Sequence, residues 1–100
     1  MAEEKIKIIY KTIAAESISH IALYIEEKGY PETAEKFQTR LYQFGNSLGI
    51  FPDKYPICRH SYFSHRQYRC AVFEGTFIFI YKVSGDNLII YNVIHGNRLQ

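Results

Sequence analysis

The sequence predicts a two-layer α+β fold in which a helical hairpin packs on a small, mainly antiparallel sheet. Apolar residues recur at helical spacing through most of residues 12–48. Three β-branched and aromatic runs then follow at residues 68–73, 77–83 and 88–95, which is typical of a β-meander. A short strand before the helices completes the order β-α-α-β, with three to four strands after the hairpin.

The first strand and the first helix lie next to each other in the chain. Lys and Ile alternate within residues 5–10, and this alternation predicts a short strand. We expect the hydroxyl of Thr12 to cap the helix that follows. Apolar residues recur at helical spacing as far as Ile25, and a basic residue beside a glycine predicts a helix end near Lys28 and Gly29.

The second helix carries the strongest periodic signal and is predicted over residues 31–48. Proline is favoured in a first helical turn, so Pro31 suits its start, and we expect Gly49 to end it. The apolar positions are Ala34, Phe37, Leu41, Phe44 and Leu48. The link between the two helices is only two residues long, so the sequence predicts an antiparallel hairpin.

The segment between the second helix and the meander is predicted to be mostly irregular. Pro52 and Pro56 predict irregular structure, followed by a short edge strand at residues 57–59 and a polar loop at residues 61–67. The last two strands are apolar at nearly every position. We therefore expect them to be central in the sheet and buried on both faces.

Length and charge set broad limits on the protein. One hundred residues, 47% of them hydrophobic, suit a single domain over residues 1–100. The net charge is +2, but residues 1–50 carry −1 and residues 51–100 carry +3. A mildly basic second half suggests an acidic partner, either nucleic acid or an acidic protein segment.

The cysteines and the absence of targeting or cofactor-binding motifs bear on metal binding, location and cofactors. Cys58 and Cys70 have neither CxxC spacing nor a set of other ligands, so we expect two reduced thiols and no metal site. No signal peptide or membrane-spanning run is visible, and a cytoplasmic protein is expected. No phosphate loop or dinucleotide fingerprint is present, so no cofactor is predicted.

A basic and aromatic group of residues precedes the meander and enters it. Arginine beside aromatic rings suits stacking on unpaired bases, and it equally suits an acidic and apolar protein segment. A loop of solvated side chains is the alternative interpretation. The group consists of Arg59, His60, Tyr62, Phe63, His65, Arg66, Tyr68 and Arg69.

In the order and spacing of its motifs, the chain resembles the RelE/ParE superfamily of toxins from type II toxin–antitoxin modules. The resemblance covers nearly the whole chain and implies that the first strand lies beside the last. The matching motifs are Ile18-x-x-Ile21-x-x-Tyr24-Ile25, Pro31-x-x-Ala34-x-x-Phe37-x-x-x-Leu41, Tyr55-Pro56-x-Cys58-Arg59, Tyr68-Arg69, Tyr81-Lys82-Val83-x-Gly85-Asp86 and Val93-Ile94-His95-Gly96-x-Arg98.

The resemblance also bears on the choice between two activities. RelE-like ribonucleases place a catalytic Arg early in the penultimate strand, a basic residue at the end of the last strand, and a Tyr or His in the tail. Here Ile78 occupies the first position, Arg98 matches the second, and the chain stops at Gln100 without the third. This pattern is more similar to that of ParE-like toxins, which poison DNA gyrase by binding.

The resemblance implies a ParE-like toxin that binds DNA gyrase and is neutralised by a cognate antitoxin. The expected target- or antitoxin-binding residues are Arg59, Arg66, Tyr68, Arg69 and Arg98. The alternative is a RelE-like ribosome-dependent mRNA endoribonuclease, in which Arg98, His95 and Arg69 form a rearranged catalytic site. A second alternative is a non-toxic, degenerate binding module.

Overall fold

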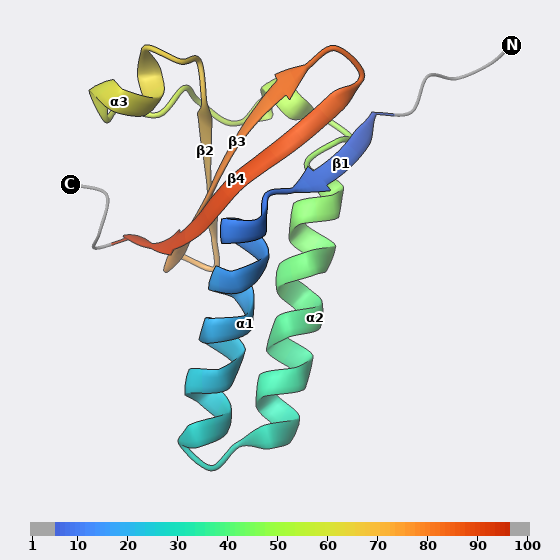
Figure 1. Ribbon diagram of the computed structural model, residues 1–100, viewed down its shortest axis with the longest axis vertical. Coiled ribbons are helices and arrows are strands. Elements are labelled where there is room, and N and C mark those ends of the chain that lie inside the picture. The colour runs from blue at the N-terminus through green and yellow to red at the C-terminus, as the bar shows by residue number, and fades with distance from the viewer. Residues whose placement is uncertain (1–5, 97–100) are drawn as a thin grey trace, which may run out of the picture.

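The computed structural model describes residues 6–96, which form two layers (Figure 1). The predicted α+β class and the predicted order of elements are confirmed. The elements are β1 (Lys7–Tyr10), α1 (Thr12–Glu27), α2 (Pro31–Ser47), the 3-10 helix η1 (Pro52–Lys54), α3 (Ser61–Ser64), β2 (Arg69–Phe73), β3 (Phe77–Ser84) and β4 (Asn87–His95).

The sheet has the strand order β1-β4-β3-β2. The first strand lies beside the last and parallel to it, as the resemblance implies, and the other two pairings are antiparallel. The prediction that β3 and β4 are central is confirmed. Their expected burial on both faces holds only in part: Ile80 is 1% exposed, whereas Ile78 and Ile94 are half-buried because α3 covers only part of that face.

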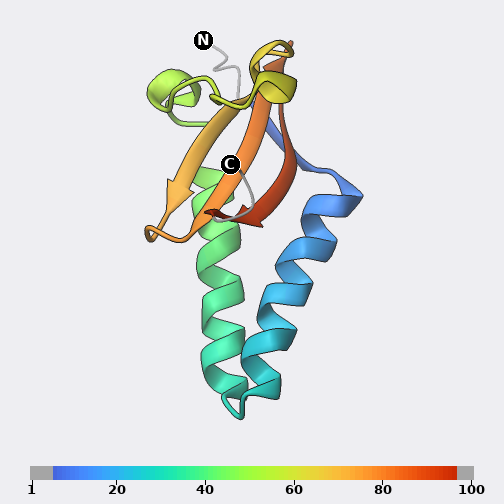
Figure 2. The same cartoon turned by 90° about the vertical axis from the view of Figure 1, so that its left-hand side faces the viewer.

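Helices α1 and α2 form the predicted hairpin. They run side by side over one face of the sheet and extend beyond its end (Figures 1 and 2). Pro31 begins α2, as predicted. Gly29, with a φ of 96°, follows α1 and donates its amide to the Glu26 carbonyl at 2.9 Å, so the predicted helix end is also confirmed.

One predicted helix cap is wrong. Lys11, and not Thr12, is the N-cap of α1, and its amide donates to the Ile90 carbonyl at 2.9 Å, next to the last pair of β1 and β4. The predicted end of the second helix is confirmed to within one residue: Ser47 is the last helical residue, Leu48 is the C-cap, and Gly49 follows. Gly49 also allows close packing, since a Cβ there would lie 2.5 Å from Ile6 Cγ2.

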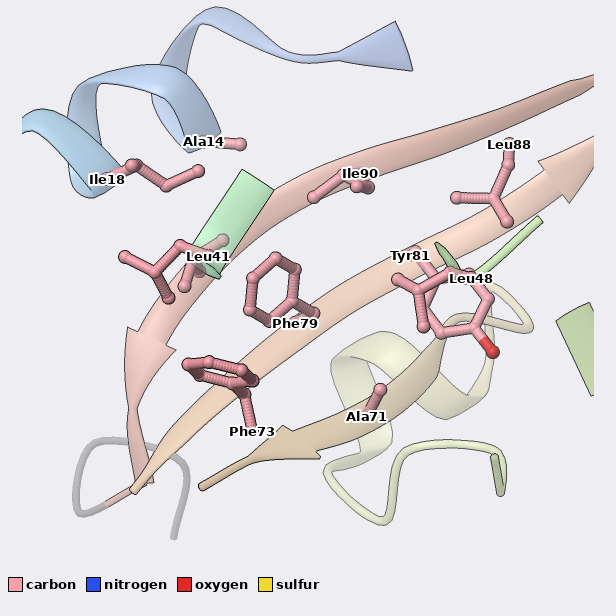
Figure 3. Packing of buried hydrophobic residues seen from close by; sticks show 11 residues of the cluster. Ala14, Ile18, Leu41, Leu48, Ala71, Phe73, Phe79, Tyr81, Leu88 and Ile90 are labelled. Atoms are coloured by element: carbon pink, nitrogen blue, oxygen red, sulfur yellow. The ribbon is translucent and has the colours of Figure 1, made fainter. Parts of the chain in front are cut away.

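The core lies between the hairpin and the sheet (Figure 3). Phe44 of α2 contacts Phe73 and Phe79 with ring centroids 5.0 Å from each, and Tyr81 is fully buried beside them. The predicted helical stripe is confirmed as the face that packs on the sheet. The core cluster consists of Ala14, Ile18, Leu41, Leu48, Ala71, Phe73, Phe79, Tyr81, Leu88, Ile90 and Val93.

Residues 55–68 run along the edge of β2 and then, through Phe63, contact the sheet face opposite the hairpin. They differ from the prediction twice. The expected edge strand is a single bridge between Ile57 and Arg69, because Pro56 has no N–H with which to extend the ladder. The expected loop contains the one-turn helix α3. His60 caps this helix, its Nδ1 accepting the Tyr62 amide at 3.2 Å.

Candidate binding surfaces

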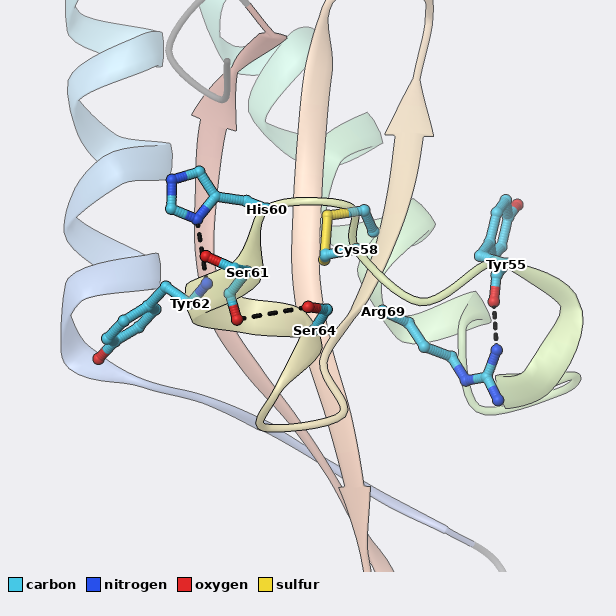
Figure 4. The surroundings of a disulfide bond; sticks show 8 residues. Tyr55, Cys58, His60, Ser61, Tyr62, Ser64 and Arg69 are labelled. Atoms are coloured by element: carbon cyan, nitrogen blue, oxygen red, sulfur yellow. Dashed lines mark hydrogen bonds between the residues drawn. A yellow bond between two sulfur atoms is a disulfide. The ribbon is translucent and has the colours of Figure 1, made fainter.

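A disulfide joins Cys58 to Cys70 and holds residues 55–68 against β2 (Figure 4). The prediction of two reduced thiols is therefore wrong. Backbone bonds around the Ile57–Arg69 bridge bring the two Cα atoms to 5.0 Å, within the span of a disulfide. A separation of 12 residues in the chain gives no sign of this pairing, which follows from how the chain folds back on β2.

The sheet face opposite the hairpin carries a continuous group of rings and cations, which we call the aromatic–basic surface. Phe63 lies at its centre, with ring centroids 5.0 Å from Tyr62, 5.9 Å from Tyr68 and 5.7 Å from Tyr91. Arg66 and Lys82 lie over the Tyr62 and Tyr68 rings. The surface consists of Tyr62, Phe63, Arg66, Tyr68, Lys82 and Tyr91.

The two cations of this surface are held by the tyrosine rings. Arg66 Cζ lies 4.0 Å from the Tyr62 ring centroid, and Arg66 Nη1 donates to the Tyr62 carbonyl at 2.8 Å. Lys82 Nζ lies 5.6 Å from the Tyr68 ring centroid. These contacts set the direction of both cations without neutralising their charge.

The remaining arginines of the predicted basic group lie elsewhere. Arg69 extends away from Tyr62 (Figure 4); its Nη1 donates to the Tyr55 carbonyl at 2.5 Å, and its Nη2 lies 3.4 Å from Asp53 Oδ1. It faces the core side, next to Tyr81 in the register. Arg59 is exposed in the bend before α3. The structure thus brings Arg66 and Tyr68 together and separates Arg69 from them.

Lys82 and Tyr91 belong to the surface, although sequence reasoning missed them. Both lie inside apolar strand runs and look like ordinary strand residues in the sequence. Lys82 pairs with Ile89, and Tyr91 lies at the irregular register between β3 and β4. Two-residue alternation within β3 assigns Lys82 to the outer face, but the bulge that places Tyr91 carries no sequence signal.

A second candidate site is a cleft of about 700 Å³ between α1 and the end of β4. Ser17 Oγ donates to Asn92 Oδ1 at 2.6 Å and closes one side of it. Tyr24, with 62% of its surface exposed, lies toward the far end of α1. The lining consists of Ser17, His20, Ile21, Tyr24, Phe77, Asn92, Val93, Ile94 and His95.

Two residues of the alternative nuclease site, His95 and Arg69, lie far apart on the sheet. His95 ends β4 and contacts the Phe77 ring edge-on, with ring centroids 5.6 Å apart. Arg69 pairs with Tyr81, four residues farther along β3 than the partner of His95, or roughly 13 Å at the usual strand rise. Arg98 lies outside the described residues.

Ile78 is the residue that the resemblance places where RelE-like nucleases have a catalytic arginine. It lies early in β3, between Val72 of β2 and Ile94 of β4 in the register. All three side chains are apolar, and none can donate to a phosphate. The sheet face around Ile78 is therefore hydrophobic.

The fold and these surfaces define a small α+β protein: a helical hairpin on a four-stranded sheet, with a cleft beside α1 and a cationic aromatic group on the outer sheet face. The sequence matches the family described as "ParE toxin of type II toxin-antitoxin system, parDE" over residues 8–100. The chain belongs to this family and is the toxin of a type II toxin–antitoxin system, for which a cognate antitoxin is the partner.

A solved structure agrees with this assignment at the level of fold. A chain described as "Chromosomal ParDE TA system from P. aeruginosa" is similar over 93% of this chain and 98% of its own, with a TM-score of 0.71 and 16% sequence identity. No match is found among curated proteins. No helix within residues 6–96 is long and apolar enough to cross a membrane.

Proposed function

We propose that this toxin acts by binding DNA gyrase and not by cutting RNA. One observation carries the proposal: apolar Ile78 stands between Val72 and Ile94, where a nuclease would have a catalytic arginine. Arg69 is held by the Tyr55 carbonyl and is far along the sheet from His95, so it is a poor substitute. Catalysis of RNA cleavage needs cationic groups and an acid–base pair around one phosphate.

Two assays on the same induced culture test this proposal. Gyrase supercoiling is measured beside mRNA cleavage on translating ribosomes. We expect inhibited supercoiling, intact mRNA and growth arrest. Cleavage that depends on ribosomes and is lost in Arg98→Ala would reject the proposal in favour of a ribonuclease. Normal growth and normal supercoiling would favour a degenerate module.

We further propose that the antitoxin neutralises the toxin by covering the cleft between α1 and β4 with an extended or helical segment. The cleft presents apolar rings and aliphatic side chains, including Ile21, Phe77 and Val93, beside the polar Ser17–Asn92 pair. A segment that folds on binding gains free energy by covering such apolar surface.

Two variants on one helix test the position of the antitoxin. Tyr24 lines the cleft and is 62% exposed, whereas Leu23 is 48% exposed and does not line it. Tyr24→Glu places a charge in the cleft and should weaken antitoxin binding at least about tenfold. Leu23→Glu is the matched control and should bind normally. Equal affinities of both variants, measured by calorimetry on folded protein, would place the antitoxin elsewhere.

A further inference from the structure

The aromatic–basic surface lies on the opposite side of the sheet from the helical hairpin. In Figure 4 α3 lies in front of the strands, and α2 lies behind them. Val72, which is 54% exposed, extends the surface with apolar area on the same outer face, since strand residues alternate between faces. The surface is therefore separate from the core and available to a partner.

The segment that carries four of the six residues of this surface has charge of one sign. Residues 54–73 contain four Lys or Arg and no Asp or Glu. The carboxylates that flank this stretch already have cationic partners: Asp53 lies 3.4 Å from Arg69, and Glu74 binds Arg40 through two hydrogen bonds of 3.0 Å. An acidic partner would therefore be attracted to this segment.

The other end of the molecule is acidic. Residues 26–35, around the turn of the hairpin, contain four Glu and only one Lys. These two regions of the toxin therefore carry opposite charge, although the net charge of the chain is only +2. A partner rich in carboxylates would be guided to the outer sheet face and away from the hairpin turn.

The rings favour a polypeptide over single-stranded nucleic acid. Bases stack on open faces of aromatic rings. Here Arg66 covers one face of Tyr62, Lys82 covers one face of Tyr68, and Phe63 contacts its ring neighbours at interplanar angles of 57° to 88°. A carboxylate can bind the exposed side of either cation without displacing a ring, whereas a stacking base must move it.

The surface is also held in place before any partner arrives. The disulfide fixes residues 55–68 to β2, and the Cys58 amide donates to the Tyr68 carbonyl at 2.9 Å. Arg66 is further restrained by its bond to the Tyr62 carbonyl. Such preorganisation reduces the entropy lost on binding.

We propose that the aromatic–basic surface docks an acidic, apolar-rich polypeptide segment of the protein on which the toxin acts. This step rests on the proposed function, because it assumes that the toxin works by binding a protein target. Carboxylates of the segment would pair with Arg66 and Lys82, and its apolar side chains would pack on Tyr62, Tyr91 and Val72. The antitoxin, at the α1–β4 cleft, would use a different surface.

A peptide of defined composition tests the chemistry directly. The probe is a fluorescent twelve-residue peptide in which Glu alternates with Leu and Tyr, and the control peptide has Gln for Glu. We expect the Glu peptide to bind at least about tenfold more tightly, with an affinity that falls as salt rises from about 50 to about 300 mM. Equal binding of the two peptides, or tighter binding of a twelve-nucleotide oligothymidine, would overturn the proposal.

Charge-reversal variants locate the binding site. Arg66→Glu and Lys82→Glu should each weaken the Glu peptide about tenfold. Lys36→Glu makes the same charge change at an exposed position of α2 and should change binding less than about twofold. Tyr91→Ala tests the rings without a change of charge and should also weaken binding. If Lys36→Glu weakened peptide binding as much as Arg66→Glu does, the effect would reflect only the net charge of the protein, and the proposal would be overturned.

A growth assay tests whether the acidic segment belongs to the target protein or to the antitoxin. Arg66→Glu should abolish growth arrest while still co-purifying with the antitoxin encoded beside it. Lost co-purification would assign the surface to the antitoxin and overturn the proposal. If the wild-type chain itself does not arrest growth, the proposed function fails, and the peptide measurements alone decide whether the surface binds acidic segments.

Discussion

Tyr81 donates a hydrogen bond from its hydroxyl to the Pro52 carbonyl oxygen at 2.5 Å. The Tyr81 ring is fully buried in the core, and its oxygen points to the rim of the cluster (Figure 3). Pro52 begins η1, the first turn of the irregular segment that follows α2. This one bond therefore connects the core face of β3 to the chain that leads to the aromatic–basic surface.

Tyr81→Phe should lower the free energy of unfolding by about 1–2 kcal/mol, because the ring keeps its packing while the Pro52 carbonyl loses its donor. Urea unfolding followed by circular dichroism measures the loss. Tyr30→Phe is the matched control, since Tyr30 is 61% exposed, and its stability should be unchanged. If Tyr81→Phe were as stable as the wild type, water would be replacing the tyrosine hydroxyl at the Pro52 carbonyl without loss of free energy.

Two tyrosines, the buried Tyr81 and the half-buried Tyr10, predict sensitivity to alkaline pH. Burial raises the pKa of Tyr81 to about 12, against a smaller lowering by nearby Arg69. Burial, with a contribution from Tyr42, also raises the pKa of Tyr10 to about 12. In the unfolded chain both groups titrate near pH 10. Their contribution to stability is fully present below about pH 10 and is lost as pH rises to about 12, because only the unfolded chain ionises readily.

The free energy of unfolding, measured from pH 8 to pH 12, checks this prediction. The wild type should lose stability steeply above about pH 10. A variant with both Tyr10→Phe and Tyr81→Phe should start lower and fall less, because it has lost the two groups that titrate. Parallel curves for the two proteins would assign the alkaline loss to other groups.

Most of the fold could be predicted because its elements carry local signals. The stripe of Ala34, Phe37 and Leu41 requires a helix, and the apolar runs of β3 and β4 require central strands. The errors fall where tertiary contacts override local preference. Thr12 is a capping residue by its type, but the Lys11 amide pairs with the Ile90 carbonyl of β4, and the helix begins one residue earlier than predicted.

The candidate surfaces could be predicted only in part, because they depend on register. Arg66 and Tyr68 were expected to act together, and they lie on the same outer face. Arg69, next in sequence to Tyr68, faces the opposite side, because successive strand residues alternate. The cysteine pairing likewise depends on a single bridge that no local pattern encodes.

Gly45 marks the closest approach of α2 to the sheet. A Cβ at this position would overlap the Tyr10 hydroxyl and lie 3.2 Å from both Phe79 Cε2 and Ile90 Cδ1. Gly45→Ala gains about 1 kcal/mol of helix propensity but overpacks the core at about 1–3 kcal/mol. We expect a net loss of about 1 kcal/mol of stability in denaturant unfolding.

A double-mutant cycle with Tyr10→Phe isolates the cause of that loss. The Tyr10 hydroxyl donates to Asn46 Oδ1 at 2.8 Å, so Tyr10→Phe alone should destabilise slightly. Removing the oxygen also makes room for the alanine methyl group. Tyr10→Phe should therefore cost less in the Gly45→Ala background than in the wild type, whereas strict additivity would place the strain at Phe79 and Ile90.

Removal of the disulfide should destabilise the fold and loosen the aromatic–basic surface. Cys58→Ser with Cys70→Ser frees residues 55–68 from β2, and closure of a loop of this length is worth about 3 kcal/mol in the unfolded chain. We expect a lower thermal midpoint and faster amide exchange in α3, while exchange in the α1–α2 hairpin stays slow. Reductant should reproduce both effects in the wild type and leave the variant unchanged. Wild-type protein that reacts with maleimide while still folded would contradict the pairing, since paired sulfurs cannot be alkylated.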